Sequence, residues 1–204
     1  MTVNVNSVVT GAAYLPLGGG TMTGAIQFSD TIWPRPKTGV TLSALNVLDY
    51  YGRTDLALNT LRASPIWFAE KQTLDRIGVS IAGAGGAGAN IRVGLYTDDG
   101  TGYPNALVAG GSTELDATVA ASVLDTVSYQ VSRGLYWLVS NHDDATIDLD
   151  CVTNQLRILS DLLGSYKSGY IIATAYGALP ATFPGSASLS TLTPVPLYRV
   201  LSFP

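Results

Sequence analysis

The chain has 204 residues and a formal net charge of −4, and only 13% of its residues are charged. A net negative charge leaves no basic surface to bind the phosphate backbone of a nucleic acid, so generic nucleic-acid binding is excluded. Although 47% of the residues are hydrophobic, no apolar run approaches the ~18–20 residues that span hydrocarbon, so no membrane insertion is expected. High apolarity with so few charges indicates a surface that is partly buried between subunits.

The N-terminus has no basic region and no continuous apolar stretch, so the sequence predicts no secretory signal. The single cysteine, Cys151, cannot form an internal disulfide, and no CxxC metal spacing is present. We therefore expect a chain that is made in a cytoplasm and holds neither a metal nor another cofactor.

Residues 1–37 form a leader of unusual composition. Valines alternate with asparagines near its start and predict a short strand. Pro16 and the glycines at 18–20 then forbid a helix and mark a tight turn. The apolar residues occur in short clusters, whose burial would not offset an ordering cost of roughly 1–2 kcal/mol per residue. We expect an extended arm that becomes ordered by association.

Residues 38–73 carry the only helical signal and are expected to form a short helical linker. Leu42, Leu45 and Leu48 recur at three-residue spacing. Thr41 or Ser43 can cap the helix, and Gly52 follows as a stop. Two interpretations remain open at this point. The helix covers one end of a β domain, or its leucines line a seam between three chains.

From Leu74 onward, apolar residues alternate with polar ones, and Gly, Pro and Asp turns separate the alternating segments. Residues 135–139 are apolar throughout, as is typical of a central strand. Within them, Tyr136 and Trp137 are expected to point to opposite faces. No amphipathic helix intervenes. The sequence therefore predicts a mostly β fold, with an antiparallel, jelly-roll-like β-sandwich over residues 74–204.

The leader contains the segment YLPLGGGTMTGAI at residues 14–26. It resembles the LPL-x-GGTMTG-x-I element of bacteriophage tail-fibre and related virion fibre proteins, in which small residues crowd near the axis of a parallel trimer. The resemblance implies a homotrimer attached to a virion. Long fibres often repeat the element, and its single copy here suggests a short fibre. The residues expected to contact sister chains or the virion are Leu15, Leu17, Met22, Ile26 and Trp33.

A second resemblance covers residues 76–150. The segments IRVGLYTDDGTGYPNALVAGGS and VSYQVSRGLYWLVSN are similar to carbohydrate-binding-like or jelly-roll modules of phage and bacterial surface proteins. This similarity implies a domain that meets a host surface. The receptor-facing loops are expected to carry Tyr103, His142, Asp143, Asp144 and Phe183.

Candidate chemistry is sparse. His142 is the only histidine, and its segment NHDDAT favours a solvated loop position over an acid–base role, because neither GxSxG nor HExxH occurs. The adjacent acidic residues at 98–99 and 143–144 either bond their own turns or hold Ca²⁺. Trp33 and Trp67 are interpreted as plugs between the arm and the sandwich rather than as sugar-stacking platforms. The proline-rich loop at 177–196 is either functional or held by a partner.

Three functions remain open. The first is a short trimeric tail fibre or adhesin that presents its sandwich to a host glycan or protein. The second is a capsid decoration or head-fibre protein that uses the same arm. The third, a tail-associated glycan hydrolase, is disfavoured because such enzymes need a long parallel β-helix or a cleft with two spaced carboxylates. We expect a non-enzymatic virion protein made in the host cytoplasm, whose partners are itself and other virion proteins.

Overall fold

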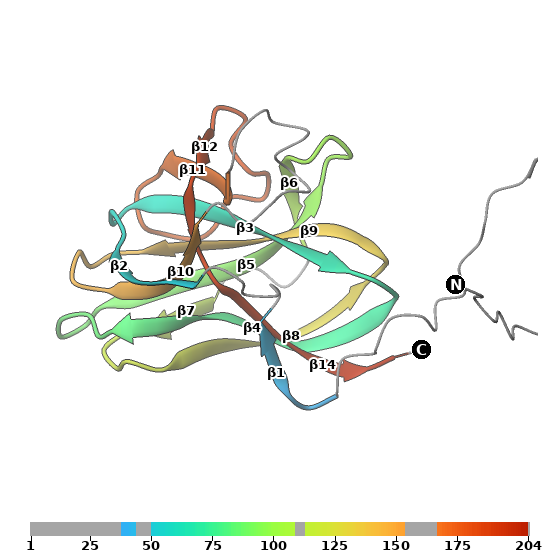
Figure 1. Ribbon diagram of the computed structural model, residues 1–204, viewed down its shortest axis with the longest axis horizontal. Helices are drawn as coiled ribbons and strands as arrows, with labels where there is room; N and C mark the ends of the chain where they lie inside the picture. The colour runs from blue at the N-terminus through green and yellow to red at the C-terminus, as the bar shows by residue number, and fades with distance from the viewer. Residues whose placement is uncertain (1–37, 44–49, 109–112, 154–166, 204) are drawn as a thin grey trace, which may run out of the picture. The chain divides into compact units, whose positions relative to one another are not determined.

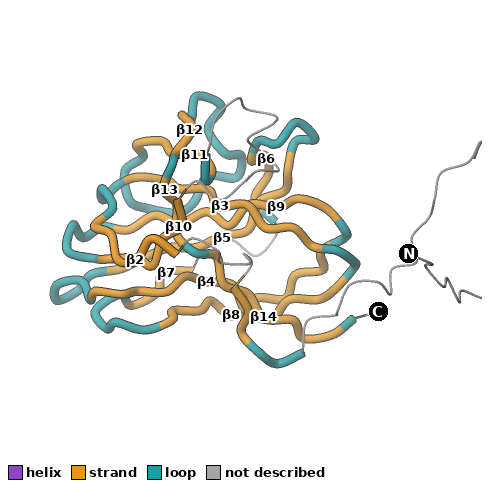
Figure 2. The backbone as a smooth tube through the Cα atoms, viewed as in Figure 1, coloured by secondary structure: helices purple, strands orange, loops and turns teal. Residues whose placement is uncertain are grey.

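The computed structural model describes residues 38–43, 50–108, 113–153 and 167–203. In these ranges every regular element is a β-strand, and the strands form two antiparallel sheets (Figures 1 and 2). The prediction of a mostly β chain with a sandwich-like arrangement is confirmed. Among the described residues there is no helix long and apolar enough to cross a membrane.

Eight of the strands pair in two sets of four. The order in the first sheet is β2-β10-β4-β8, and in the second sheet it is β3-β9-β5-β7. The first set has the bounds β2 (Tyr50–Asp55), β4 (Gln72–Gly83), β8 (Ser122–Val131) and β10 (Asp148–Thr153). The second set has the bounds β3 (Thr60–Phe68), β5 (Asn90–Asp98), β7 (Thr113–Asp116) and β9 (Gly134–His142).

The remaining described strands extend these sheets. In the second sheet, β11 (Gly169–Ala173) pairs with β3, β12 (Ser188–Ser190) pairs with β11, and β6 (Pro104–Leu107) pairs with β5. In the first sheet, β10 pairs with β4 only at Asp148 and Leu149. β13 (Leu192–Pro194) then follows β10, and β14 (Pro196–Ser202) follows β4. β1 (Thr41–Ser43) adds to the free side of β14.

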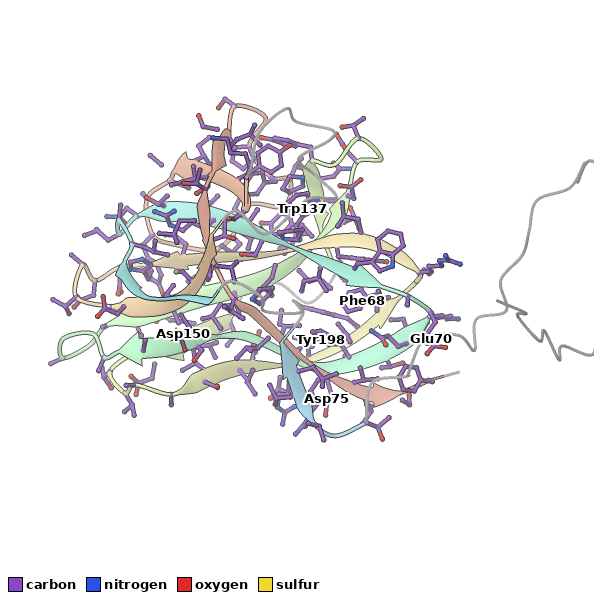
Figure 3. All side chains as sticks on the ribbon, viewed as in Figure 1. Phe68, Glu70, Asp75, Trp137, Asp150 and Tyr198 are labelled. Atoms are coloured by element: carbon purple, nitrogen blue, oxygen red, sulfur yellow. The ribbon has the colours of Figure 1, made fainter. Side chains whose placement is uncertain are left out.

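The main core lies between the sheets. Phe68 of β3 makes edge-to-face contacts with Tyr136 and Tyr198, at centroid distances of 5.3 and 5.4 Å. Figure 3 shows Phe68 beside Tyr198 of β14, so this contact packs one sheet on the other. Next to it, Arg199 donates two hydrogen bonds to Asp75, of 2.9 and 2.5 Å, which join β14 to β4.

The second sheet is buried on both faces. Tyr136 packs against the main core, whereas Trp137 belongs to a second cluster on the outer face, so the predicted alternation is confirmed. The loop after β11 covers this outer cluster, with Leu179 and Phe183 buried in it. Leu179 packs closely over Gly94 of β5: a Cβ there would lie only 2.7 Å from a methyl group of Leu179, so that side chain would have to shift. Burial on both faces explains the unbroken apolar run at 135–139.

The segment expected to be a helical linker contributes strands to both sheets. Leu45 and Leu48 lie outside the described residues, while the segments on either side of them form β1 and β2. Most notably, β3 pairs with β9 along residues 62–68. The sequence pattern does not predict this strand, because Leu61 and Ala63 face the outer cluster while Ile66 and Phe68 face the core, and this removes the alternation of apolar with polar residues. The leader, residues 1–37, lies outside the described residues.

Candidate functional site

The two ends of the sandwich differ in what they carry. At one end of β4, Thr73 pairs with Ser202, and the N–H of Gly39 donates to the carbonyl of Val200 at 2.9 Å. We call this the terminal end, because the chain enters β1 there. At the other end of β4, Gly83 pairs with Asp148. We call this the loop end. β4 has 12 residues, which places the two ends roughly 35 Å apart.

Three loops meet at the loop end, namely residues 84–89, 117–121 and 143–147. The N–H of Gly85 donates to the carbonyl of Ala117 at 2.9 Å, and the N–H of Ala117 donates to that of Ala89 at 3.0 Å. The carboxylate of Asp144 accepts from the N–H of Gly86 at 3.1 Å. These bonds make one connected surface, from which Val119 projects with 62% of its area exposed.

His142 differs from its predicted solvated loop position. It is the last residue of β9, pairs with Ile91 and is only 1% exposed. The prediction is wrong because β9 extends to His142 and the polar turn begins one residue later. The Nδ1 atom lies 2.9 Å from the carbonyl oxygen of Asp144. A carbonyl only accepts, so Nδ1 carries the proton. The buried ring supports the turn and presents no surface to a receptor.

Asp143 and Asp144 lie in the turn after β9, at the loop end, and bond backbone groups. Asp143 Oδ1 accepts from the N–H of Asn90 at 2.7 Å. Asp144 Oδ1 accepts from both the N–H and the hydroxyl of Thr146, each at 2.7 Å. The Thr146 hydroxyl is the main cause that lowers the pKa of Asp144. In the described ranges no three acidic, histidine or cysteine side chains gather as a metal site.

Tyr103 and Phe183 lie elsewhere, on the outer face of the second sheet. The Phe183 ring lies 5.9 Å from the rings of Tyr96 and Tyr103 and is 3% exposed. The Tyr103 hydroxyl donates to the carbonyl of Pro184 at 2.5 Å. The expected exposure of Phe183 is therefore wrong, because its loop folds back onto its own sheet. The five predicted receptor-facing residues do not form one surface.

Sequence reasoning missed a polar cluster beside the loop end. Arg92 of β5 forms an ion pair of 2.9 Å with Glu114, and Tyr176 donates to the same carboxylate at 3.1 Å. The guanidinium also lies 5.6 Å from the centre of the Tyr176 ring. Burial, with Glu114 as a second cause, raises the pKa of Tyr176. No local signal joins these three residues, because they come from segments far apart in the sequence.

Trp67 and Cys151 are the two remaining residues that the sequence analysis singled out. Trp67 is 56% exposed near the terminal end, while its expected companion Trp33 lies outside the described residues, as do the leader positions expected to contact sister chains. Cys151 is fully buried, and burial raises the pKa of its thiol to about 12. The thiol therefore stays protonated and inert at neutral pH.

Comparison of the chain with models of known protein families gives no match. A search of the curated proteins gives no match either. Any assignment of function therefore depends on the element at residues 14–26 and on the geometry of the two ends.

Proposed function

We propose that this chain is a bacteriophage virion structural protein, a short trimeric fibre that attaches through its leader and presents the sandwich to a host surface. The observation that carries the proposal is the separation of the two ends. The chain enters the sandwich at the terminal end, and a connected three-loop surface lies at the other end of β4. The resemblance at residues 14–26 supports the trimer and the virion attachment.

The strand order supports the finer fold assignment that is part of this proposal. Consecutive strands from β2 to β10 alternate between the sheets, except that β5 is followed by β6 and β7 in the same sheet. The pairings β2-β10-β4-β8 and β3-β9-β5-β7 follow the order of a jelly roll, which is built from eight strands in two sheets. We therefore propose a jelly roll extended by the C-terminal strands.

The polar cluster beside the loop end supports host-surface binding. Arg92, Glu114 and Tyr176 combine charged hydrogen-bonding groups with a partly exposed aromatic ring. Groups of this kind fix the orientation of polar ligands such as glycans. The proposed role is binding, with no catalytic residue and no cofactor.

Attachment is tested by deleting the leader. Light scattering of the full chain is expected to give three times 21.3 kDa, and a stable monomer at micromolar concentration contradicts the trimer. A variant without residues 1–37 is expected to keep its β circular dichroism, because both sheets form from later residues, yet to be absent from purified particles. If it assembles at normal copy number, the sandwich is the docking face and the protein acts as a capsid decoration protein.

Receptor binding is tested at the loop end. Replacing Arg92, Glu114 and Tyr176 together by alanine is expected to reduce the binding of the protein to host cells at least tenfold while leaving the trimer intact. The matched control replaces Lys71, an exposed residue at the terminal end, and is expected to bind normally. Equal loss in both variants, or loss in neither, rules out the loop end as the receptor surface.

A further inference from the structure

Residues 174–176, which follow β11 and end in Tyr176 of the polar cluster, are held by two asparagines from other parts of the chain. Asn141 of β9 donates from its side-chain amide to the carbonyls of the first two residues of this segment, at 3.2 and 3.5 Å. Asn59, in the loop before β3, accepts the N–H of Tyr176 on its Oδ1 atom at 2.8 Å. Side chains therefore fix the backbone of a segment that lies outside the strands.

The backbone of Asn59 adds two further bonds. Its φ of +56° lies in the left-handed region, and in the described ranges no other residue except glycine has a positive φ. Asparagine tolerates this conformation better than most residues. The N–H of Asn59 donates to the carbonyl of His142 at 2.9 Å, and its carbonyl accepts the N–H of Thr174 at 2.8 Å. Asn59 thus joins the end of β9 to the segment that carries Tyr176.

The position of Tyr176 determines the geometry of the polar cluster. One oxygen of Glu114, Oε2, accepts from both Arg92 and the Tyr176 hydroxyl, at 2.9 and 3.1 Å, and the guanidinium lies over the Tyr176 ring. The Glu114 side chain is 45% exposed, so water competes for these bonds and they hold the ring only weakly. The backbone bond to Asn59 therefore adds to what keeps the ring beside the guanidinium.

We propose that Asn59 is a positioning residue of the receptor-binding surface, which holds Tyr176 in the orientation that binds without touching the receptor itself. This inference rests on the proposed role of the polar cluster in host-surface binding. A side chain that is already fixed loses little freedom when a ligand binds, and this lowers the entropic cost of binding. Loss of the Asn59 Oδ1 atom therefore weakens binding although every group that contacts the receptor is still present.

Two substitutions separate the side chain of Asn59 from its backbone. Asn59→Gly keeps the left-handed conformation, which glycine adopts freely, but lacks the acceptor for the Tyr176 N–H. Asn59→Asp keeps an acceptor oxygen and tolerates the same conformation. We expect Asn59→Gly to bind intact host cells about threefold to tenfold more weakly, in keeping with the loss of one hydrogen bond. We expect Asn59→Asp to bind as the original protein does, and an equal loss in both variants overturns the proposal.

The background Tyr176→Ala shows whether Asn59 acts through the tyrosine. In this background Asn59→Gly is expected to cause no further loss of host-cell binding, because no ring is left to position. A further loss of the same size in the double variant means that Asn59 contacts the receptor directly or acts on the fold as a whole. That result overturns the positioning role.

Site-resolved nitration distinguishes a failure of this inference from a failure of the proposed function. Tetranitromethane nitrates the phenolate form of tyrosine, and burial together with the bond to Glu114 raises the pKa of Tyr176, so we expect slow nitration there. Asn59→Gly is expected to raise the nitration rate of Tyr176 at least twofold, measured by mass spectrometry of peptides. The rate at Tyr198, a buried tyrosine of β14, is expected to stay unchanged.

The two readouts then give separate answers. An unchanged nitration rate at Tyr176 overturns the inference, whatever the binding results. A raised rate, combined with host-cell binding that Tyr176→Ala does not weaken, supports the holding of Tyr176 by Asn59 and overturns the proposed function instead.

Discussion

Two turns of the sandwich begin with the same pair of aspartates, and their local bonds are alike. At residues 98–99, Asp99 Oδ1 accepts the N–H and the hydroxyl of Thr101, each at 2.7 Å. At residues 143–144, Asp144 Oδ1 accepts the N–H and the hydroxyl of Thr146, again at 2.7 Å. An aspartate followed two residues later by threonine therefore forms the same closed turn in both places.

The two turns differ in their distant partners. Asp98 accepts the indole N–H of Trp137 at 2.9 Å and so locks its turn to the aromatic cluster on the outer face. Asp143 accepts the N–H of Asn90, and Asp144 that of Gly86, so the second turn joins the loops of the loop end. The same dipeptide thus stabilises the sheet in one place and builds the proposed contact surface in the other. What distinguishes the turns is the tertiary partner.

The largest expected effect comes from breaking the first distant bond. Asp98→Ala leaves the indole N–H of Trp137, a side chain with no exposed surface, without its acceptor, and is expected to lower the free energy of unfolding by about 2–3 kcal/mol. Urea unfolding measures this. In the background Trp137→Phe, which has no N–H, the same substitution is expected to cost much less. An equal cost in both backgrounds contradicts the role of the bond.

A smaller effect is expected in the second turn. Asp143→Ala removes the acceptor of the Asn90 N–H, which is only partly buried, so water replaces part of the lost interaction. The expected decrease in the free energy of unfolding is about 1 kcal/mol. Because this turn lies at the loop end, host-cell binding of the folded variant is expected to fall as well. A larger destabilisation than that of Asp98→Ala reverses the comparison between the turns.

Asp99 and Asp144, whose carboxylates close the two turns, are expected to show the same dependence on pH. Hydrogen bonds from Thr101 and Thr146 hold the pKa values of Asp99 and Asp144 below the ordinary aspartate value. Carboxyls with lowered pKa stabilise the fold above their unfolded pKa, about 3.9, and this contribution is lost as the pH falls through the folded pKa. Thr101→Val and Thr146→Val are each expected to raise the pKa of the neighbouring carboxyl, measured by NMR titration.

A matched control for this titration exists in Asp116, which bonds Thr118 in the same manner. Its pKa is also lowered, chiefly by the Thr118 hydroxyl, and is expected to remain unchanged in both valine variants. If only one of the two valine variants raises its carboxyl pKa, the local equivalence of the turns is refuted.

The smallest expected effect is that of calcium. The oxygens of Asp98 and Asp144 already accept N–H and O–H groups, whose positive ends point to where a cation would sit. We therefore expect millimolar Ca²⁺ to leave the unfolding temperature unchanged. A clear rise that EDTA reverses, and that Asp144→Asn removes, would establish a calcium site at the loop end.

The sequence predicts those parts of the fold that have one buried face. Ile77, Val79 and Ile81 of β4 alternate and lie in the core as expected. The strand β3 could not be recognised, because its two faces contact two different clusters. A pattern with period two exists only where one face meets water, so a doubly covered strand looks like any other apolar segment.

Of the candidate site, the sequence predicts only the bonds between residues that are close together in the chain. The turn at 143–144 follows from its aspartates and Thr146, which lie close in the sequence. The burial of Phe183 does not, because it depends on the folding of its loop over β5, where Tyr96 donates to the carbonyl of Pro180 at 2.5 Å. Contacts between residues more than eighty positions apart leave no trace in the local sequence.

The position of β14 has a consequence for how the protein is made. This strand pairs with β4 through residues 73–79, and it buries Tyr198 and Val200. A ribosome produces residues 80–195 before β14 exists, so the edge of β4 that receives it has no final neighbour throughout that time. Folding of the first sheet must therefore finish after this strand emerges. A stop codon just before residue 196 is therefore expected to yield a chain that aggregates rather than a folded protein that is only slightly shorter.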